Sequence, residues 1–229
     1  SSVAGGGKTR GAQSAQWLAA HAAGKKMTRP GSSESLAVVL LAAGGSTRLG
    51  QPKQLVPVDG EALVLRTARS LLHLKPAVML VVTGCESDRV KEQLAGLPLQ
   101  IVHNTGWKKG MGASIACGVK SLPEGIEGVL IMLCDQWRVD LDDLKRLIEA
   151  WDTDISDMVC AKWKSRKATV FSPPAIFPGR LFHELKNLTG DRGAKRIIEE
   201  FKGKTTFVEM ENAAFDLDEK DDLKGLSSR

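Results

Sequence analysis

The sequence contains no tyrosine, only 5% aromatic residues, and only four cysteines and four histidines among its 229 residues. The cysteines form no C-x-x-C pair, and no histidine lies near them with the spacing of a zinc site. A disulfide scaffold and a structural zinc site are therefore disfavoured. Apolar runs all fall short of the roughly 18 residues that a membrane-spanning helix needs. We expect a cytoplasmic protein with reduced cysteines and no membrane partner.

The positive charge is unevenly distributed along the chain. The net charge is +5, and residues 1–34 hold most of it, with five basic residues against Glu34: Lys8, Arg10, Lys25, Lys26 and Arg29. The remainder is close to neutral, so no basic face is expected and no nucleic-acid partner is predicted. We expect residues 1–35 to be a disordered or cloning-derived leader and residues 36–229 to form one domain.

Apolar runs alternate with segments of helical character from residue 36 onward. The apolar runs cover 36–43, 77–83, 99–103, 128–134 and 158–163, and the helical segments cover 62–73, 88–95, 111–122 and 141–151. Such alternation indicates βαβ units with right-handed crossovers. We predict an α/β fold, a three-layer sandwich with a mostly parallel, Rossmann-like sheet.

The pattern becomes less regular after residue 163. A basic loop leads to Ala168–Phe171, and Ser172-Pro173-Pro174 is expected to break any regular element. A helix over 193–201, a strand over 205–209 and a short final helix after Asp218 complete the expected elements.

The most informative segment is the glycine-rich stretch 41–55, which follows the first apolar run. Open α/β sheets bind ligands at the carboxyl ends of their strands, where this stretch would lie. Its glycines would let backbone amides approach an anion, while two hydroxyls and two cations would assist: Gly44, Gly45 and Gly50; Ser46 and Thr47; Arg48 and Lys53. The composition predicts a loop that binds the phosphates of a nucleoside triphosphate.

This stretch resembles the signature L-A-A-G-x-S-x-R-[ML]-G-x-x-K of the MobA-like nucleotidyltransferases. Segments beginning at His103, Leu130, Gly190 and Phe215 resemble further motifs of that family, so the resemblance covers about residues 36–223. It implies the fold of nucleotide-diphospho-sugar transferases and a nucleotide-binding set: Leu41, Ala42, Ala43, Gly44, Gly45, Ser46, Thr47, Arg48, Lys53, Asn104, Gly110 and Ser114.

The expected metal site is acidic. Asp135 ends an apolar strand, so its carboxylate should emerge at the same sheet edge as the glycine-rich stretch. Nucleoside triphosphate chemistry needs Mg²⁺, which takes few protein carboxylates and completes its shell with phosphate and water. Asp216 and Asp218 share one face of an extended segment, and we favour Asp216 as the second ligand.

The resemblance implies transfer of a nucleoside monophosphate to a phosphorylated acceptor, with loss of pyrophosphate. Arg48, Lys53 and Asp135 would be catalytic, and Gln136, Asp191 and Arg192 would lie on the acceptor side. The Ala42-Ala43-Gly44 start favours CTP over GTP as the nucleotide. Molybdopterin is then the expected acceptor, and a molybdoenzyme is a candidate recipient of the product.

The acceptor half departs from the family pattern. Trp137 stands where the family usually has proline, and its ring is expected to alter the mouth of the site. Residues 167–170 and Glu219-Lys220 also differ from the usual motifs. Two alternatives therefore stay open: a nucleotidyltransferase for a sugar or polyol phosphate, and an accessory protein that binds a nucleotide or cofactor without catalysis.

Overall fold

The structure, a computed structural model, describes residues 34–166 and 168–226, and for residues 224 and 225 only the backbone. The leader expected at 1–35 thus lies outside the described residues, apart from Glu34 and Ser35. One large sheet has the strand order β5-β4-β1-β6-β8-β7-β9. Its strands are β1 (Leu36–Ala42), β4 (Val78–Thr83), β5 (Gln100–His103), β6 (Gly128–Leu133), β7 (Met158–Lys164), β8 (Thr169–Pro178) and β9 (Thr205–Glu209). A small hairpin pairs β2 (Pro57–Val58) with β3 (Glu61–Ala62).

β1 lies at the centre of the sheet and is buried along its whole length. It pairs in parallel with β4 on one side and β6 on the other, so that Leu40 faces Val81 and Met132 across the ladders. A strand covered on both faces needs a continuous apolar sequence, which explains the unbroken run of residues 36–42. Only β8 runs antiparallel to its neighbours in this sheet of the described residues, and the predicted mostly parallel sheet is confirmed.

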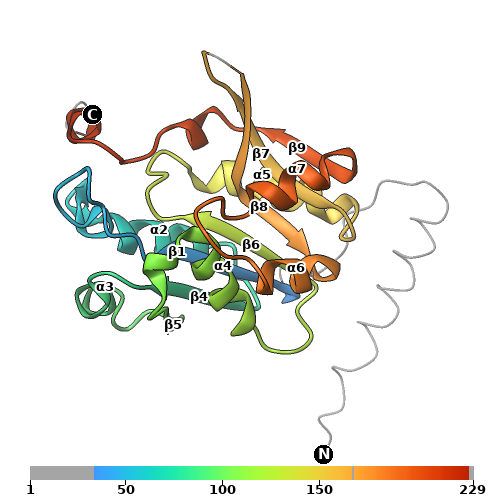
Figure 1. Cartoon of the computed structure of the whole chain (residues 1–229), viewed down its shortest axis with the longest axis horizontal. Coiled ribbons are helices and arrows are strands. Elements are labelled where there is room, and N and C mark those ends of the chain that lie inside the picture. The colour runs from blue at the N-terminus through green and yellow to red at the C-terminus, as the bar shows by residue number, and fades with distance from the viewer. Residues whose placement is uncertain (1–33, 167, 227–229) are drawn as a thin grey trace, which may run out of the picture.

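Helices cover both faces of the sheet, which gives the three expected layers (Figure 1). On one face α2 (Leu63–Leu72), α3 (Ser87–Gln93) and α5 (Leu141–Thr153) bury their apolar sides. On the other face lie α4 (Met111–Lys120), α6 (Phe182–Lys186) and α7 (Lys195–Glu200), with α4 packed beside α6. The sequence of α5 fixes its start, since Asp140 and Asp143 form a reciprocal capping box.

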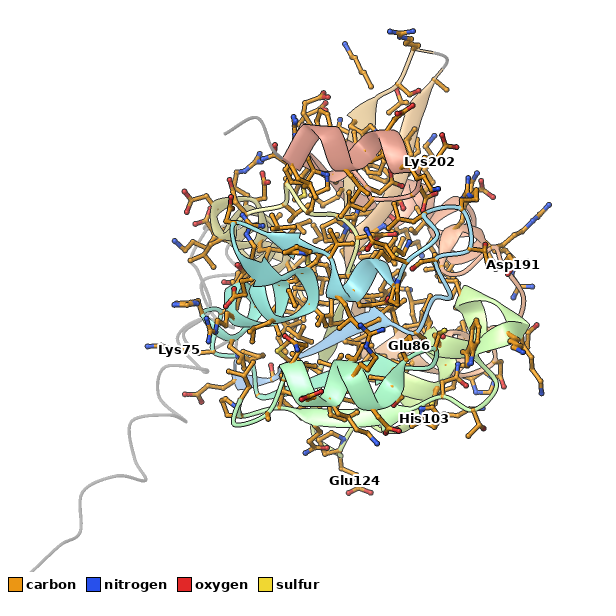
Figure 2. The ribbon with its side chains drawn as sticks, turned by 90° about the vertical axis from the view of Figure 1, so that its left-hand side faces the viewer. Lys75, Glu86, His103, Glu124, Asp191 and Lys202 are labelled. Atoms are coloured by element: carbon orange, nitrogen blue, oxygen red, sulfur yellow. The ribbon has the colours of Figure 1, made fainter. Side chains whose placement is uncertain are left out.

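The carboxyl ends of the parallel strands define one edge of the molecule. Figure 2 shows His103, at the end of β5, and Glu86, after β4, toward the same side as Asp191 and Lys202. Lys75, which precedes β4, lies on the opposite side. The segment around 191–202 therefore comes to the edge that holds the glycine-rich stretch.

The prediction that Ser172-Pro173-Pro174 interrupts regular structure is wrong. These residues lie within β8, and the Pro173-Pro174 peptide bond is cis. The ladder with β7 is irregular at this point: Ala161 pairs with Ser172, whereas the preceding Cys160 pairs with Ala175. Both prolines therefore lie at the irregularity of the ladder, where no backbone amide donor is required.

The remaining expectations for the second half are closer to the structure. The strand at 205–209 is confirmed, and the helix expected over 193–201 is shorter, spanning Lys195–Glu200. The final helix is a 3₁₀ helix, η7 (Lys220–Leu226). Among the described residues, no helix combines the length and apolar character needed to cross a membrane.

Candidate functional site

The glycine-rich stretch folds back on itself directly after β1. Ser46 has a positive φ of 50° and Gly50 one of 77°, and the Gly50 amide donates to the Ser46 carbonyl over 3.2 Å. The Ser46 hydroxyl accepts a 2.9 Å hydrogen bond from the amide of Lys53, which begins the 3₁₀ helix η2 (Lys53–Leu55). This closed loop brings Lys53 back beside the end of β1.

A chain of charges crosses the site from this loop to the C-terminal segment. The Lys53 ammonium hydrogen-bonds to Asp135 Oδ2 and lies 3.3 Å from Asp218 Oδ1. The other Asp218 oxygen accepts a 2.7 Å hydrogen bond from Arg48. Burial alone would lower the pKa of Lys53, but the charges and hydrogen bonds of Asp135 and Asp218 outweigh it and raise that pKa. Lys53 is therefore held as a cation between two carboxylates.

The second oxygen of Asp135 is the best candidate for a metal ligand. Oδ1 is buried and has no hydrogen-bond partner among the described residues, which is costly for an ionised carboxylate. A hard divalent cation favours such an oxygen donor. No preformed group of three or more acidic, cysteine or histidine ligands occurs in the described part of the chain. A bound metal would thus need ligands from the substrate phosphates, as Mg²⁺ usually takes.

Asp216, the expected second ligand, takes no part in the hydrogen bonds and ion pairs that join Lys53 and Arg48 to Asp135 and Asp218. Its side chain lines a separate cavity of about 260 Å³ beside Trp137 and Arg138. Surrounding protein, and then the negative charges of Asp135 and Asp218, raise the pKa of Asp216. The charges are thus near enough to interact, but the structure brings Asp218, and not Asp216, to Lys53.

A cavity of about 460 Å³ opens beside this centre. The indole ring of Trp107 forms part of its wall and packs against the backbone: a β-carbon on Gly84 would come within 2.6 Å of Trp107 Cβ, and one on Gly45 within 3.1 Å of the ring. Of the nucleotide-binding residues expected from sequence, those that line the cavity are Leu41, Ala43, Gly44, Gly45, Ser46, Thr47, Lys53, Gly110 and Ser114.

A second cavity, of about 590 Å³, adjoins the first. Met111, Leu133 and Asp191 line both cavities and so form the wall between them. The rest of its lining comes from β8 and the region of α7: Ala168, Thr169, Val170, Phe171, Ser172, Pro173, Arg192, Ala194, Lys195, Ile198, Glu199 and Lys202. The expected acceptor-side residues Asp191 and Arg192 are therefore in this cavity, together with the altered segment before Phe171.

The loops of the two cavities are joined by their backbones. The Gly112 amide, at the start of α4, donates to the Gly190 carbonyl over 2.8 Å. A β-carbon on Gly110 would lie 2.4 Å from the Gly190 carbonyl carbon, so no larger residue fits there. The left-handed φ of 99° at Gly110 adds a second reason for glycine.

Besides Asp216, four expected residues lie outside both linings. Gln136 is buried and donates to the carbonyls of Pro173 and Ala213, over 2.7 and 3.2 Å, so it braces the backbone below the acceptor side. Asn104 is also buried, and its amide donates to the Ser114 hydroxyl over 3.0 Å. Ala42 contributes a carbonyl that accepts from Gln54, and Arg48 is exposed and paired with Asp218.

The expectation that Trp137 shapes the mouth of the site is wrong. Its side chain is 6% exposed and belongs to the core on the face of α2 and α5. The Trp137 carbonyl accepts a 2.9 Å hydrogen bond from Arg66 of α2. The Trp137 side chain thus packs into the core, and the residue lines the small cavity beside Asp216.

Sequence reasoning missed Gln54. It is 1% exposed, and its amide nitrogen donates to the carbonyls of Ala42 and Gly44 over 3.0 and 2.7 Å. It thereby holds the turn in which β1 becomes the glycine-rich loop. A polar residue next to Lys53, in a segment otherwise expected to pack, is the signal that could have identified it.

Comparisons with known proteins agree with this geometry. The purine catabolism protein PucB of Bacillus subtilis is 28% identical over 172 residues, which cover 70% of this chain and 78% of PucB. The bifunctional protein GlmU of Pseudomonas syringae pv. tomato is 35% identical over 117 residues, which cover 50% of this chain but only 25% of GlmU.

Among solved structures, Rv0371c of Mycobacterium tuberculosis superposes with a TM-score of 0.75 at 23% identity, covering 85% of this chain and 98% of that one. Another crystal structure of that protein is a complex with manganese. These likenesses show the same fold. The family model described as the MobA-like NTP transferase domain matches residues 38–206, and the chain belongs to this family.

Proposed function

We propose that this chain transfers a nucleoside monophosphate from a nucleoside triphosphate to a phosphorylated acceptor and releases pyrophosphate. The observation that carries the proposal is the charged centre beside the first of two adjoining cavities. Lys53 and Asp135 line the first cavity beside the glycine-rich loop, and Met111, Leu133 and Asp191 line both cavities. Two substrates bound in these cavities would meet at this wall.

The loop residues would bind the triphosphate. Residues 44–47 line the first cavity, so their amides and hydroxyls would bind phosphate oxygens, and Lys53 and Arg48 would offset phosphate charge. Because both cations are paired with Asp218 in this structure, the triphosphate would exchange places with that carboxylate as it binds. The Lys53 ammonium then remains charged and in contact with anions throughout.

A divalent cation, Mg²⁺ or Mn²⁺, fits the unpaired oxygen of Asp135, with Asp218 or Asp216 as a second carboxylate. When bound, such an ion would neutralise charge on the transferring phosphoryl group. The acceptor phosphate is ionised at neutral pH, so its oxygen can attack the α-phosphorus without a strong general base. Alignment by the two cavities and stabilisation by cations would provide the catalysis.

Molybdopterin is the acceptor that we favour, and CTP is the favoured nucleotide. The second cavity combines an apolar, aromatic interior from Val170, Phe171 and Ile198 with cations at Arg192, Lys195 and Lys202. A phosphate attached to a flat ring system suits such a lining. A sugar or polyol phosphate is the alternative supported by the similarity to GlmU, and the many apolar lining groups disfavour it.

The test is pyrophosphate release with Mg²⁺, comparing CTP, GTP, ATP and UTP against molybdopterin, a sugar 1-phosphate and a polyol phosphate. We expect release with molybdopterin, fastest with CTP. Release only with a sugar or polyol phosphate would replace the acceptor. Tight binding of CTP without release for any acceptor would favour a non-catalytic, cofactor-holding protein.

A further inference from the structure

Arg138 lies between two aromatic rings that belong to segments far apart in the sequence. Its guanidinium is 4.7 Å from the Trp137 ring and 3.8 Å from the centre of the Phe215 ring. Trp137 follows the acidic end of β6, whereas Phe215 immediately precedes the Asp216–Asp218 segment. Arg138 therefore bridges the two parts of the chain that supply carboxylates to the site.

The two rings differ in how firmly they are held. The Trp137 side chain is 6% exposed, and its backbone carbonyl accepts a hydrogen bond from Arg66. Phe215 is 41% exposed, one of two large apolar side chains so exposed among the described residues. A guanidinium stacked on such a ring covers one face of it and attracts its π-electrons. Arg138, which contacts the buried Trp137 ring, therefore provides the packing surface for the Phe215 ring.

The contacts of Arg138 indicate that the stack is its main attachment. Its Nε atom is buried and has no hydrogen-bond partner among the described residues. A buried polar atom without a hydrogen-bond partner lowers the stability of the fold, whereas the Nε atom of an exposed arginine would bind water. The contacts with the Trp137 and Phe215 rings are favourable interactions that act against this cost.

The segment that follows Phe215 contacts the charged centre. The Leu217 amide donates to the Asp135 carbonyl over 3.1 Å, next to the carboxylate that contacts Lys53. Asp218, one residue further, contacts both Lys53 and Arg48. A shift of Phe215 would therefore move Asp218 relative to Asp135.

We infer that Arg138 is a positioning residue: by clamping Phe215 against Trp137 it sets the spacing of the carboxylates that would hold the catalytic cation. This inference rests on the proposed function. It does not require Arg138 to touch either substrate, and neither large cavity includes Arg138 in its lining.

The experiment measures binding of Mn²⁺ to the full chain by calorimetry, alongside the Mn²⁺ dependence of pyrophosphate release. Replacing the guanidinium in Arg138→Met, or the ring in Phe215→Leu, should each weaken Mn²⁺ binding roughly two- to fivefold, the factor that one exposed cation–π contact supports. The binding of CTP without metal should stay unchanged. Because both substitutions break one contact, the double variant should lose little more than either single variant.

The matched control is Arg180→Met, which removes a guanidinium 5.5 Å from the Phe201 ring, away from the charged centre. It should leave Mn²⁺ binding unaltered, and Arg138→Lys should restore part of what Arg138→Met loses. Wild-type Mn²⁺ affinity in Arg138→Met, or strictly additive losses in the double variant, would overturn the inference. If the wild-type protein releases no pyrophosphate at all, the proposed function fails, while the comparison of Mn²⁺ affinities still tests the clamp.

Discussion

The cavity of about 460 Å³, the proposed nucleotide site, adjoins the cavity of about 590 Å³, the proposed acceptor site, yet the two are built in different ways. The first takes about half of its lining from one continuous stretch, the end of β1 and the loop to Gln54, and the rest from residues 107–114, the end of β6 and Asp191. The second is gathered from β8 and the region of α7, together with the wall it shares with the first. The glycine-rich wall of the first site therefore depends on the backbone geometry of that loop, whereas the second site depends on how β8 packs against the region of α7. Substitutions should separate the two sites accordingly.

The largest effect is expected at the charged centre beside the first cavity. Asp135→Asn keeps the size of the side chain but removes the charge that Lys53 and a divalent cation would share. Loss of several kcal/mol of charge stabilisation should lower kcat for pyrophosphate release by roughly 10³-fold. Asp142→Asn, which replaces an exposed acidic residue on α5, is the control and should leave kcat unchanged. Near-normal turnover in Asp135→Asn would remove the proposed metal site.

Lys53→Met should impair the nucleotide side more than the acceptor side. The substitution removes the cation between Asp135 and Asp218 and leaves the Asp135 carboxylate buried without its partner. We expect kcat to fall by roughly 10²-fold, as for loss of one donor to a developing charge, and the Kd for CTP to rise. Lys91→Met on α3 is the matched control. An unchanged Kd for CTP would separate Lys53 from phosphate binding.

Gln54→Leu tests whether local geometry governs the first cavity. Leucine cannot donate to the carbonyls of Ala42 and Gly44, and both would lose their buried donor. The free energy of unfolding should fall by about 2 kcal/mol, and the KM for CTP should rise while the KM for the acceptor stays constant. Thermal unfolding and initial rates measure both, with the exposed Gln93→Leu as control. Equal rises in the two KM values would contradict the separation.

Lys202→Ala makes the converse test on the acceptor side. Its ammonium lies 4.2 Å over the Phe171 ring at the second cavity. Removing this cation should raise the KM for a phosphorylated acceptor roughly threefold, since an exposed charge contact is worth at most about 1 kcal/mol. The Kd for CTP should not change, and Lys204→Ala, exposed nearby, should alter neither constant. A changed Kd for CTP would show that the cavities are not separate.

The smallest effect concerns Asp216. Its pKa is raised by burial and by the charges of Asp135 and Asp218, so the folded protein holds this proton to higher pH than the unfolded chain does. Stability contributed by this residue is therefore lost as pH rises from the ordinary aspartate pKa through the raised one. Asp216→Asn should raise Tm slightly at neutral pH, and the difference should vanish near about pH 3. A lower Tm at neutral pH would contradict the sign.

The same contrast explains what the sequence could predict. The parallel sheet and the glycine-rich loop follow from residues close together in the chain: the unbroken run 36–42, and the spacing from Gly44 to Lys53. The path of β8 through Pro173 and Pro174 could not be read locally, because it depends on the irregular ladder with β7. Likewise, only packing decides whether Asp216 or Asp218 reaches Lys53, since their spacing gives both the same face.

The hydrogen bond from the Gly112 amide to the Gly190 carbonyl has a consequence for how this protein could be re-engineered. It joins the N-terminus of α4 to the 190–193 turn. Replacing either segment with the loop of a relative would therefore disturb the other. The hairpin of β7 and β8, in contrast, projects beyond the rest of the sheet and supplies one wall of the acceptor cavity (Figure 1). Attempts to change the acceptor by exchanging segments should therefore begin with residues 168–173, which line the second cavity and belong to this hairpin.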